Sequence, residues 1–581
     1  MLTTVHEPAA DPSATPAVRR TSPVAVWNAA LVVVGVAVTA FAGWQERWIA
    51  DDGLIVLRTA RQLLAGNGPV FNTGERVEVN TSTVWTALVT AAGLVPGVRL
   101  DWAAVGLGLV CTAAGVGLGM DAARRLHGSP GAVLVPAGAA VLLALPPMRD
   151  FVTSGLETGL VTLWLAGTWW LLVRLVQDGR GAWGAAVALG LGPLVRPDLG
   201  IVAVLGLALL VALVRPGWRR VLGLSAAAGA LPIAYEVFRM GYYGLLVPST
   251  ALAKEASGAR WDQGLVYLRD TAATYWLWLP LACVLAVLVA LIGRHGGWAQ
   301  RWGTVAVVLL PVVSGLLMGA YVVRVGGDFM HGRMLLPAIT AALLPVMVVP
   351  VTRRTAVPLV GVAVWFGFMA TGLGLVYGER SDVAGIVDER AFWSAGVGAP
   401  YPVSVDDFVE GSALVRRSVR AVERADVPSL VILEQSAGSD VWRSYPAAAD
   451  VDHITIPFLN LGMMGAAQPL DVRVVDAIGL SNPLARHATP LFGGRIGHDK
   501  DLPLAWFVAD EGRPGSVLPA PPDQVLDARR ALQCPGIIEV LDSVRAPLTP
   551  ERFWSNLTGA AERTGFRYSR LPSLAAQECG R

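Results

Sequence analysis

Charged residues are scarce in this chain. Asp, Glu, Lys and Arg make up 15% of its 581 residues, whereas 54% are apolar, and the mean hydropathy is +0.53. A soluble protein of this length does not need so much apolar surface, so the composition predicts a membrane protein with several spans. The formal net charge is +2 and the sequence has no basic cluster, which argues against nucleic acid as a partner.

Lysine and cysteine are also rare. The lysines are Lys254 and Lys500, so arginine carries nearly all of the positive charge. Two of the four cysteines, Cys534 and Cys579, lie in a polar C-terminal region. We expect them to form a disulfide if that region faces an oxidising compartment.

Long apolar runs dominate the first 377 residues. Eleven of them are long enough, or nearly so, to cross a hydrocarbon core about 30 Å thick. They lie at about 25–45, 101–120, 131–147, 155–176, 181–195, 199–214, 221–238, 276–293, 303–322, 334–351 and 356–377. A twelfth run, 81–97, is shorter and is interrupted by Gly93 and Pro96. We expect this run to lie on or dip into the membrane surface.

The arginines determine the expected orientation. Arg19 and Arg20 precede the first run, which lacks a cleavage site and so stays as an anchor, and they place the N-terminus in the cytoplasm. If 81–97 does not cross, the cytoplasmic loops carry Arg124, Arg125, Arg174, Arg180, Arg215, Arg219, Arg220, Arg294, Arg301, Arg353 and Arg354. If it does cross, these arginines move outside, against the positive-inside rule. The loops then predicted to lie outside are 46–80, 148–158, 196–198, 239–275 and 323–333, together with the C-terminal region.

From about residue 378 the composition becomes that of a soluble protein. The segments 427–436, 471–480 and 504–510 are predicted to be buried strands, and about 200 residues suffice for a domain with its own core. The predicted parts are a cytoplasmic tail (1–23), a transmembrane catalytic domain (24–377) whose first outer loop spans 46–100, and an extracytoplasmic domain (378–581) that is mixed α/β or β-rich.

The stretch WIADDGLIVLRTARQLLAG, residues 48–66, follows the first span. Its apolar residues alternate with Arg58 and Arg61, a pattern typical of a helix that lies in the membrane interface with its basic side toward lipid headgroups. One of Asp51 and Asp52 can cap this helix. A second acid beside lipid is costly and usually functional, so capping of both and a catalytic role remain alternatives.

The chain resembles the GT-C glycosyltransferases, and within them the actinobacterial AftB family of arabinofuranosyltransferases. The resemblance is carried by the acidic pair and its helix, and by TSGLET (153–158), GYYGLLVPST (241–250), GGDFMHGRMLLPA (326–338) and VVDAIGLSNPLARH (474–487). It implies a GT-C fold in the plasma membrane with an extracytoplasmic active site. The implied donor is decaprenylphosphoryl-arabinofuranose, and the implied acceptor is the arabinan of arabinogalactan or lipoarabinomannan, which receives a terminal β(1→2) arabinofuranose. It also implies that the catalytic carboxylate lies in the first outer loop.

Transfer from a phospho-sugar needs a carboxylate near the reacting carbon, acting either as base toward the acceptor hydroxyl or as nucleophile, and cations at the departing phosphate. We expect the catalytic acids to be Asp51, Asp52 and Glu157. The expected phosphate contacts are Lys254, Arg333, His331 and Arg58. The expected sugar contacts are Asp328, Tyr242, Tyr243, Arg196 and Asp198.

Each of these residues also has an ordinary structural explanation. Lys254 can reach lipid headgroups, Glu157 can cap a helix, and His331 can be a hydrogen-bonded core residue. Arg196 and Asp198 can pair across the turn that Pro197 creates. The two tyrosines can belong to an aromatic belt at the membrane interface.

The sequence also bears on metal binding and on alternative functions. No His, Cys and carboxylate residues have the spacing of a zinc site, so we predict no metal and no required cofactor, although Asp51, Asp52 and Glu157 could hold a hard cation. The alternatives are a GT-C enzyme for another lipid-linked sugar such as mannose, a transporter, and a non-enzymatic membrane protein. The sequence shows no duplicated halves with broken helices, which disfavours the transporter. A monomer surrounded by membrane lipid is expected.

Overall fold

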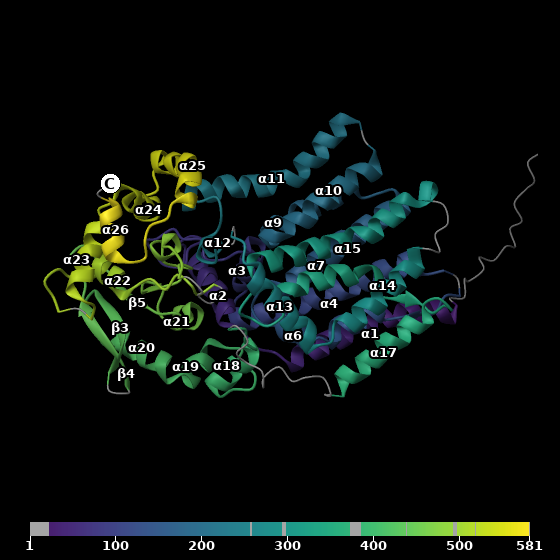
Figure 1. Cartoon of the computed structure of the whole chain (residues 1–581), viewed down its shortest axis with the longest axis horizontal. Helices are drawn as coiled ribbons and strands as arrows, with labels where there is room; N and C mark the ends of the chain where they lie inside the picture. Colours follow the sequence, from purple (N-terminus) through teal and green to yellow (C-terminus); the bar gives the residue numbers. More distant parts are fainter. Residues whose placement is uncertain are drawn as a thin grey trace, which may run out of the picture.

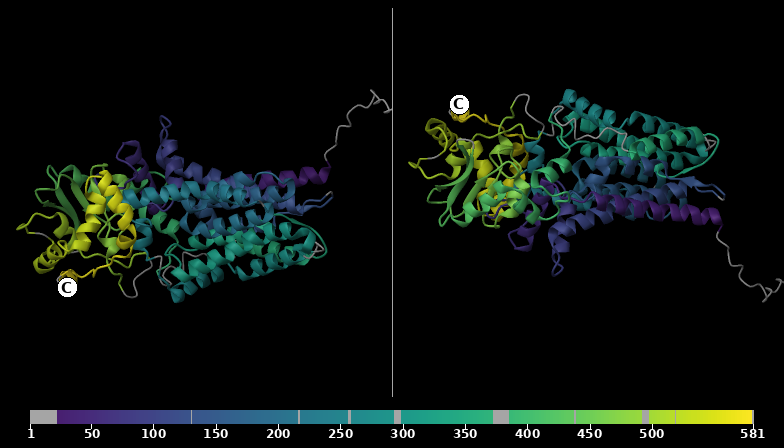
Figure 2. Two further views of the ribbon diagram at one scale, coloured as in Figure 1. Left: turned by 90° about the horizontal axis from the view of Figure 1, so that it is seen from above. Right: turned by 90° about the horizontal axis from the view of Figure 1, so that it is seen from below.

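Near-parallel helices form a bundle, and a domain of helices and a small sheet covers one end of it (Figure 1). The computed structural model describes residues 22–129, 131–215, 217–255, 258–292, 298–371, 385–436, 439–491, 497–517 and 519–579. Residues 1–21 of the predicted tail, Arg294, and the predicted domain boundary at 377/378 lie outside the described residues. Figure 2 shows α1 (Pro23–Gln45) starting at the end of the bundle away from the C-terminal domain.

Six helices within the described residues are long and apolar enough to cross a membrane. They are α1, α4 (Leu100–His127), α7 (Thr158–Asp178), the run Pro197–Val214 that contains η1 (Pro197–Leu199) and α10 (Gly200–Val214), α11 (Trp218–Tyr243) and α15 (Trp298–Val325). A seventh candidate is the pair α13 (Trp261–Thr274) and α14 (Trp278–Ile292), which is bent by 85°. The helices agree with the predicted multi-span class.

Four of the eleven expected spans, 131–147, 181–195, 334–351 and 356–377, contain shorter elements. These are β1 (Leu134–Val135), α5 (Ala137–Ala144), α6 (Pro146–Phe151), α8 (Ala182–Gly190), α9 (Gly192–Val195), η2 (Arg333–Leu335), α16 (Leu336–Leu343), η3 (Leu344–Val346), β2 (Val349–Pro350) and α17 (Ala356–Ala370). The strands β1 and β2 pair in antiparallel fashion. Helix length alone therefore supports six or seven spans, and the count of eleven stays a prediction.

The segment 81–97 forms α3 (Thr83–Gly93) followed by a turn. A helix of 11 residues is about 16 Å long at 1.5 Å per residue, which is too short for a hydrocarbon core of about 30 Å. Ser82 accepts a hydrogen bond from the N–H of Trp85, so the helix begins at Thr83. Its length agrees with the expectation that this run does not cross.

The C-terminal domain is mixed α/β. Its strands β3 (Ser429–Ser436), β4 (Ser439–Pro446), β5 (Ile454–Pro457) and β6 (Arg473–Val475) lie in the order β4-β3-β5-β6, with β3 and β4 antiparallel and the other pairs parallel. The helices are α18 (Glu389–Val397), α19 (Val405–Gly411), α20 (Ala413–Glu423), α21 (Leu461–Ala467), η5 (Ala485–His487), α22 (Leu504–Glu511), α23 (Pro522–Ala531), α24 (Pro535–Arg545), α25 (Pro550–Gly565) and α26 (Pro572–Cys579).

Of the three predicted strands, one is confirmed. Residues 427–436 contain β3, but 504–510 is the helix α22, and the prediction of a strand there is wrong. All residues from Ala505 to Ala509 are buried, and a short, wholly buried run looks the same in a strand and in a helix. The third segment, 471–480, is a strand only at β6, because Asp476 accepts hydrogen bonds from N–H groups of residues 478–481 and turns the chain.

The predicted disulfide between Cys534 and Cys579 is present. It joins the residue before α24 to the end of α26, with the two Cα atoms 5.3 Å apart. Together with the packing of α23 against α26, the disulfide holds the last helices of the domain to one another.

The helix α2 (Asp51–Leu64) does not lie with its basic side toward lipid, so that expectation is wrong. Arg58 is fully buried and donates hydrogen bonds to the carbonyl oxygens of Phe71 (2.9 Å), Gly465 (2.6 Å) and Val472 (2.6 Å). Arg61 likewise donates to the carbonyl of Ala466 (2.7 Å). The C-terminal domain therefore occupies the side of α2 that the amphipathic pattern assigned to headgroups.

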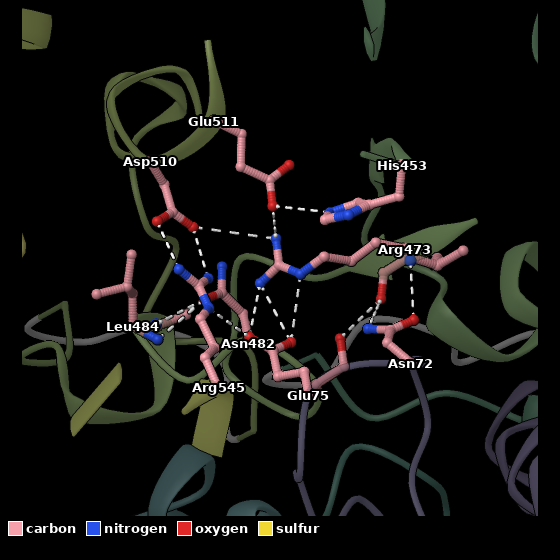
Figure 3. A network of polar contacts seen from close by, with 12 residues as sticks. Asn72, Glu75, His453, Arg473, Asn482, Leu484, Asp510, Glu511 and Arg545 are labelled. Atoms are coloured by element: carbon pink, nitrogen blue, oxygen red, sulfur yellow. Dashed lines mark hydrogen bonds and ion pairs between the residues drawn. The ribbon is translucent and has the colours of Figure 1, made fainter. Parts of the chain in front are cut away.

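A second set of buried charges joins the same two parts (Figure 3). The guanidinium of Arg473, on β6, lies 3.0 Å from Glu75 of the first outer loop and 2.8 Å from Glu511 of α22. Arg545 lies 3.0 Å from Glu75 and 2.7 Å from Asp510. Burial alone would raise the pKa of Glu75, but the two arginines hold it below its usual range. Each of these charges has at least one partner of opposite charge, and together the pairs fix the loop against the domain.

We expect Arg473→Ala to destabilise the docked domain by about 1.5–3 kcal/mol, because Glu75 and Glu511 would each lose a buried charged partner and keep only Arg545 and His453, respectively. Thermal unfolding and limited proteolysis of the full chain would detect the loss. The matched control is Arg443→Ala, which removes a largely exposed partner of Glu434 and should cost at most about 1 kcal/mol. Equal stability of the two variants would contradict this account of the interface.

Candidate active site

A cavity of about 250 Å³ lies where the bundle meets the C-terminal domain. Its walls come from α2, the residues before α3, α7, η1, α12 (Ser249–Ala253), α15, η2 and α18, and from the loops at 459–461 and 478–480 of the C-terminal domain. Seven of the predicted site residues line it: Asp51, Asp52, Glu157, Arg196, Asp198, Lys254 and Arg333. The predicted outer loops and the C-terminal region therefore meet around one site.

Asp51 connects the bundle to the C-terminal domain. Its carboxylate accepts hydrogen bonds from the N–H groups of Met463 (2.7 Å) and Gly462 (3.2 Å), in the first turn of α21. It does not cap its own helix, which has no side-chain cap at Ala50. Burial is the main cause that raises the pKa of Asp51 to about 7, and the neighbouring Asp52 adds to the rise. The carboxyl group of Asp51 is thus occupied by backbone donors.

Asp52 has a more distant polar partner than Asp51 has, and a quarter of the Asp52 side chain is exposed. Its closest cation is Arg333, whose Nη1 lies 3.5 Å from Oδ2 of Asp52. The same guanidinium donates through Nε to Asp328 at 2.7 Å, so Asp328 orients Arg333 from behind and does not itself line the cavity. Of the two adjacent aspartates, Asp52 is the one whose carboxylate is available to a ligand.

On another wall of the cavity, Arg196 holds two acids together. Its Nε and Nη2 donate to Asp198 at 2.8 and 3.1 Å, which confirms the expected pairing across the turn at Pro197. Its Nη1 lies 4.0 Å from Glu157, the residue at the N-cap position of α7. The side chain of Glu157 makes no capping hydrogen bond to that helix. Arg196 therefore neutralises part of the acidic charge in the cavity.

Lys254, at the end of α12, is the cation in the cavity that has no acidic partner among the described residues. Its Nζ lies 5.8 Å from the ring centroid of Phe329, a favourable position for a cation over an aromatic face. An ammonium without a carboxylate partner beside a cavity is suited to an anionic ligand such as a phosphate.

Besides Asp328, four other predicted site residues lie outside the cavity. Arg58 is bound to backbone carbonyls, as described above. His331 is buried, with Nδ1 2.6 Å from Asp270 and Nε2 2.9 Å from the hydroxyl of Tyr275. Tyr243 is buried and donates to the carbonyl of Pro69. Tyr242 stacks on Phe238. The structure gives these four side chains packing and hydrogen-bonding roles.

Other polar residues line the cavity that the sequence patterns did not indicate. They are Asn80, Thr250, Tyr321, Glu389, Asn460 and His498. Asn80 belongs to an Asn-Thr-Ser triplet before α3, and Glu389 belongs to the region after residue 378 whose composition is that of a soluble protein. The positions of Glu389, Asn460 and His498 at the cavity depend on how the C-terminal domain docks, which no local sequence signal marks.

The described residues contain no group of three or more His, Cys, Asp or Glu side chains placed to hold a metal ion. The three acids considered for a hard cation turn to different partners. Asp51 faces the N–H groups of α21, Asp52 faces Arg333, and Glu157 faces Arg196.

Comparisons with known proteins give a consistent result. Residues 418–565 match the AftB family C-terminal domain. A protein of Mycobacterium tuberculosis named terminal β-(1→2)-arabinofuranosyltransferase is 40% identical, with 96% of this chain and 97% of that protein covered. A protein of the same name from Corynebacterium glutamicum is also 40% identical, with 89% of this chain and 82% of that protein covered. No solved structure matches the chain.

We expect Gly462→Ala to destabilise the contact between α21 and α2, because the added Cβ would lie 1.7 Å from the backbone oxygen of Asp51. Overpacking of this kind costs typically about 1–3 kcal/mol. The melting temperature of the full chain would report it. Gly396→Ala is the matched control, since its Cβ would meet no atom within 4 Å. A melting temperature for Gly462→Ala equal to that of the control would contradict the close approach.

Proposed function

The chain belongs to the family of terminal β-(1→2)-arabinofuranosyltransferases, and we propose that it transfers arabinofuranose from a decaprenyl-phosphate carrier to the end of an arabinan chain. The transfer breaks the bond between the sugar carbon C1 and the phosphate oxygen, and it forms a bond from C1 to an acceptor hydroxyl oxygen. The observation that carries the proposal is that one cavity holds both an available carboxylate, Asp52, and a cation, Lys254, that pairs with no acid among the described residues.

In this reaction Asp52 is the catalytic carboxylate. It takes the proton of the acceptor hydroxyl as that oxygen bonds to C1, while the electrons of the broken bond leave with the phosphate. Asp51 is a positioning residue, because its carboxyl group is held by the N–H groups of α21. Arg333, held by Asp328, keeps the charge of Asp52 compensated within the buried site.

Lys254 binds the phosphate of the donor. Its charge offsets the negative charge that grows on the leaving phosphate oxygen, which lowers the barrier to cleavage. Because nothing acidic competes for this ammonium among the described side chains, the full charge is available to the ligand.

The positions of the helix ends support eleven crossings, with the cavity on the extracytoplasmic side. The helices α4, α7 and α10 all begin near the cavity end: Arg99 pairs with Asp406 of the C-terminal domain, and Glu157 and Asp198 line the cavity. Their other ends carry or precede arginines, which the positive-inside rule assigns to the cytoplasm. Between them the chain must return to the cavity end, and the shorter elements β1 with α5, and α8 with α9, make that return.

The C-terminal domain contributes the acceptor side of the site. Its residues Leu459, Asn460, Ile478 and Leu480 face the same cavity as Asp52. Asp476 holds the wall at 478–480 by accepting backbone hydrogen bonds from Ile478, Gly479 and Leu480. A transferase that extends a glycan needs a wall for the acceptor next to the donor site, and this wall is apolar except for the amide of Asn460. The transporter and non-enzymatic alternatives do not account for this arrangement, and an enzyme for mannose remains an outcome of the assay below.

We expect Asp52→Asn to lower transfer by about 10²–10⁴-fold, since the acceptor hydroxyl loses its base. The assay uses the full chain in membranes, synthetic decaprenylphosphoryl-arabinofuranose and a short arabinan acceptor. Asp450→Asn, an exposed change of the same type, is the control and should keep the wild-type rate. Transfer by Asp52→Asn within threefold of the control would contradict the assignment, and transfer of mannose in preference to arabinose would contradict the donor.

Replacing Lys254 tests the phosphate contact. A hydrogen bond to a charged group contributes about 1.5–3 kcal/mol, so Lys254→Ala should raise the KM for the lipid donor about tenfold or more. Lys254→Arg keeps the charge and should recover part of the affinity. The KM for the arabinan acceptor should stay unchanged in both variants. An equal rise in the KM values for donor and acceptor would contradict a specific contact between Lys254 and the donor phosphate.

A further inference from the structure

Glu389 is a carboxyl group of the cavity to which neither the sequence patterns nor the comparisons assign a role. It is the first residue of α18, its side chain lines the cavity, and only 7% of the residue is exposed. Within the described residues its hydrogen-bond donor is the indole Nε1 of Trp393, one turn further along α18, at 2.7 Å from Oε1. No cation forms an ion pair with it among those residues.

The backbone around Glu389 is anchored to the bundle on both sides. Before it, Val387 donates to the carbonyl of Phe329 (2.8 Å) and accepts from the N–H of His331 (3.0 Å). After it, Arg390 lies 2.6 Å from Glu46 and 2.9 Å from Asp150. Two separate attachments therefore hold the carboxyl group at the cavity, which indicates a defined position instead of a chance approach of a surface helix.

The charges of the cavity do not balance. Five acids line it, namely Asp51, Asp52, Glu157, Asp198 and Glu389, against the three cations Arg196, Lys254 and Arg333. Arg196 forms ion pairs with Asp198 and Glu157, and Arg333 forms ion pairs with Asp328 and Asp52. Asp51 has two backbone donors, whereas Glu389 has a single indole N–H. Of the five acids, Glu389 has the least support for a negative charge.

We propose that Glu389 is a further carboxyl group in contact with the transferred sugar, and that it stays protonated in the resting site so that it donates a hydrogen bond to a sugar oxygen beside Asp52. The inference rests on the proposed sugar transfer in this cavity. It gives the two carboxyl groups different tasks: Asp52 accepts a proton or hydrogen bond, and Glu389 donates one. A neutral carboxyl is a donor at its O–H and still an acceptor at its carbonyl oxygen, which suits a polyhydroxylated ligand.

The electrostatics agree with this division. Burial first, and then the negative charge of Asp52, raise the pKa of Glu389 to about 8, so the protonated form is the main one below about pH 8. The charged groups that face Glu389 are Asp51 and Asp52 from α2 and Arg333 from η2. The helix α19, which packs against α18, directs Asp407 to the N–H groups of Val403 and Ser404, and its other acids, Asp406 and Glu410, are exposed.

The test compares Glu389→Gln with Glu389→Ala in the full chain, with Glu410→Gln as an exposed control on the neighbouring helix. Glutamine imitates the protonated acid and cannot ionise. We expect wild-type kcat/KM to fall as the pH rises through about 8, because the donor is lost on ionisation. Glu389→Gln should keep at least about a third of the wild-type rate at pH 7 and lose that alkaline fall, whereas Glu389→Ala should be at least about tenfold slower at every pH. Glu410→Gln should have the same kcat/KM and the same pH dependence as the wild type.

Two outcomes would overturn the proposal: Glu389→Gln as slow as Glu389→Ala, or an alkaline fall that persists in Glu389→Gln. Infrared difference spectra of the substrate-free protein give a readout that does not depend on the reaction. The wild type should show a carbonyl band of a protonated carboxyl group that titrates near pH 8 and is lost in Glu389→Gln, whereas the contribution of Asp51, whose pKa is about 7, should remain in both proteins. Absence of that band refutes the protonated state. Failure of wild-type transfer with a normal band refutes the proposed function and leaves the protonated carboxyl in place.

Discussion

The docking of the C-terminal domain against α2 is the interaction on which the site depends. Charges removed from water must be paired or hydrogen-bonded, and this interface pairs them across the two parts of the chain. Arg58 is bound by carbonyl oxygens at 465 and 472, Asp51 by N–H groups of α21, and Glu75 by Arg473 and Arg545. Because each partner would be left buried and unpaired on separation, α2 has one position, and Asp52 is directed into the cavity.

That arrangement gives neighbouring carboxyl groups different properties. Asp51 and Asp52 are adjacent in the chain and point to different surroundings, one to a helix N-terminus and the other to a cavity with Arg333. Glu389 adds a third carboxyl whose surroundings favour the neutral form. Lys254 stands apart from these acids as a cation that a phosphate can bind. The cavity thus contains carboxyl groups in different surroundings together with an ammonium that pairs with no acid among the described residues.

Most of the helical spans and several site residues could be predicted from the sequence, because the signals are local. A long apolar run must satisfy its own backbone within lipid, so the runs that became α1, α4 and α7 were recognisable. An acid beside such a run is costly, which marked Asp52 and Glu157. The burial of Arg58 was not predictable, since its amphipathic pattern fits a membrane surface as well as a protein surface. The prediction of a strand at 504–510 was wrong for a similar reason, because the apolar run that forms α22 has no periodicity that distinguishes a helix from a strand.

The sequence by itself determined the class of protein, the extent of the main apolar spans, the disulfide partners and the acidic pair that follows the first span. These follow from composition and from residues close together in the chain. Only the tertiary structure decided which aspartate is available, because the donors that occupy Asp51 lie 411 residues further along the chain. It also decided that Glu389 lines the cavity and that Arg58 lies outside it, since both positions depend on long-range packing that no local pattern encodes.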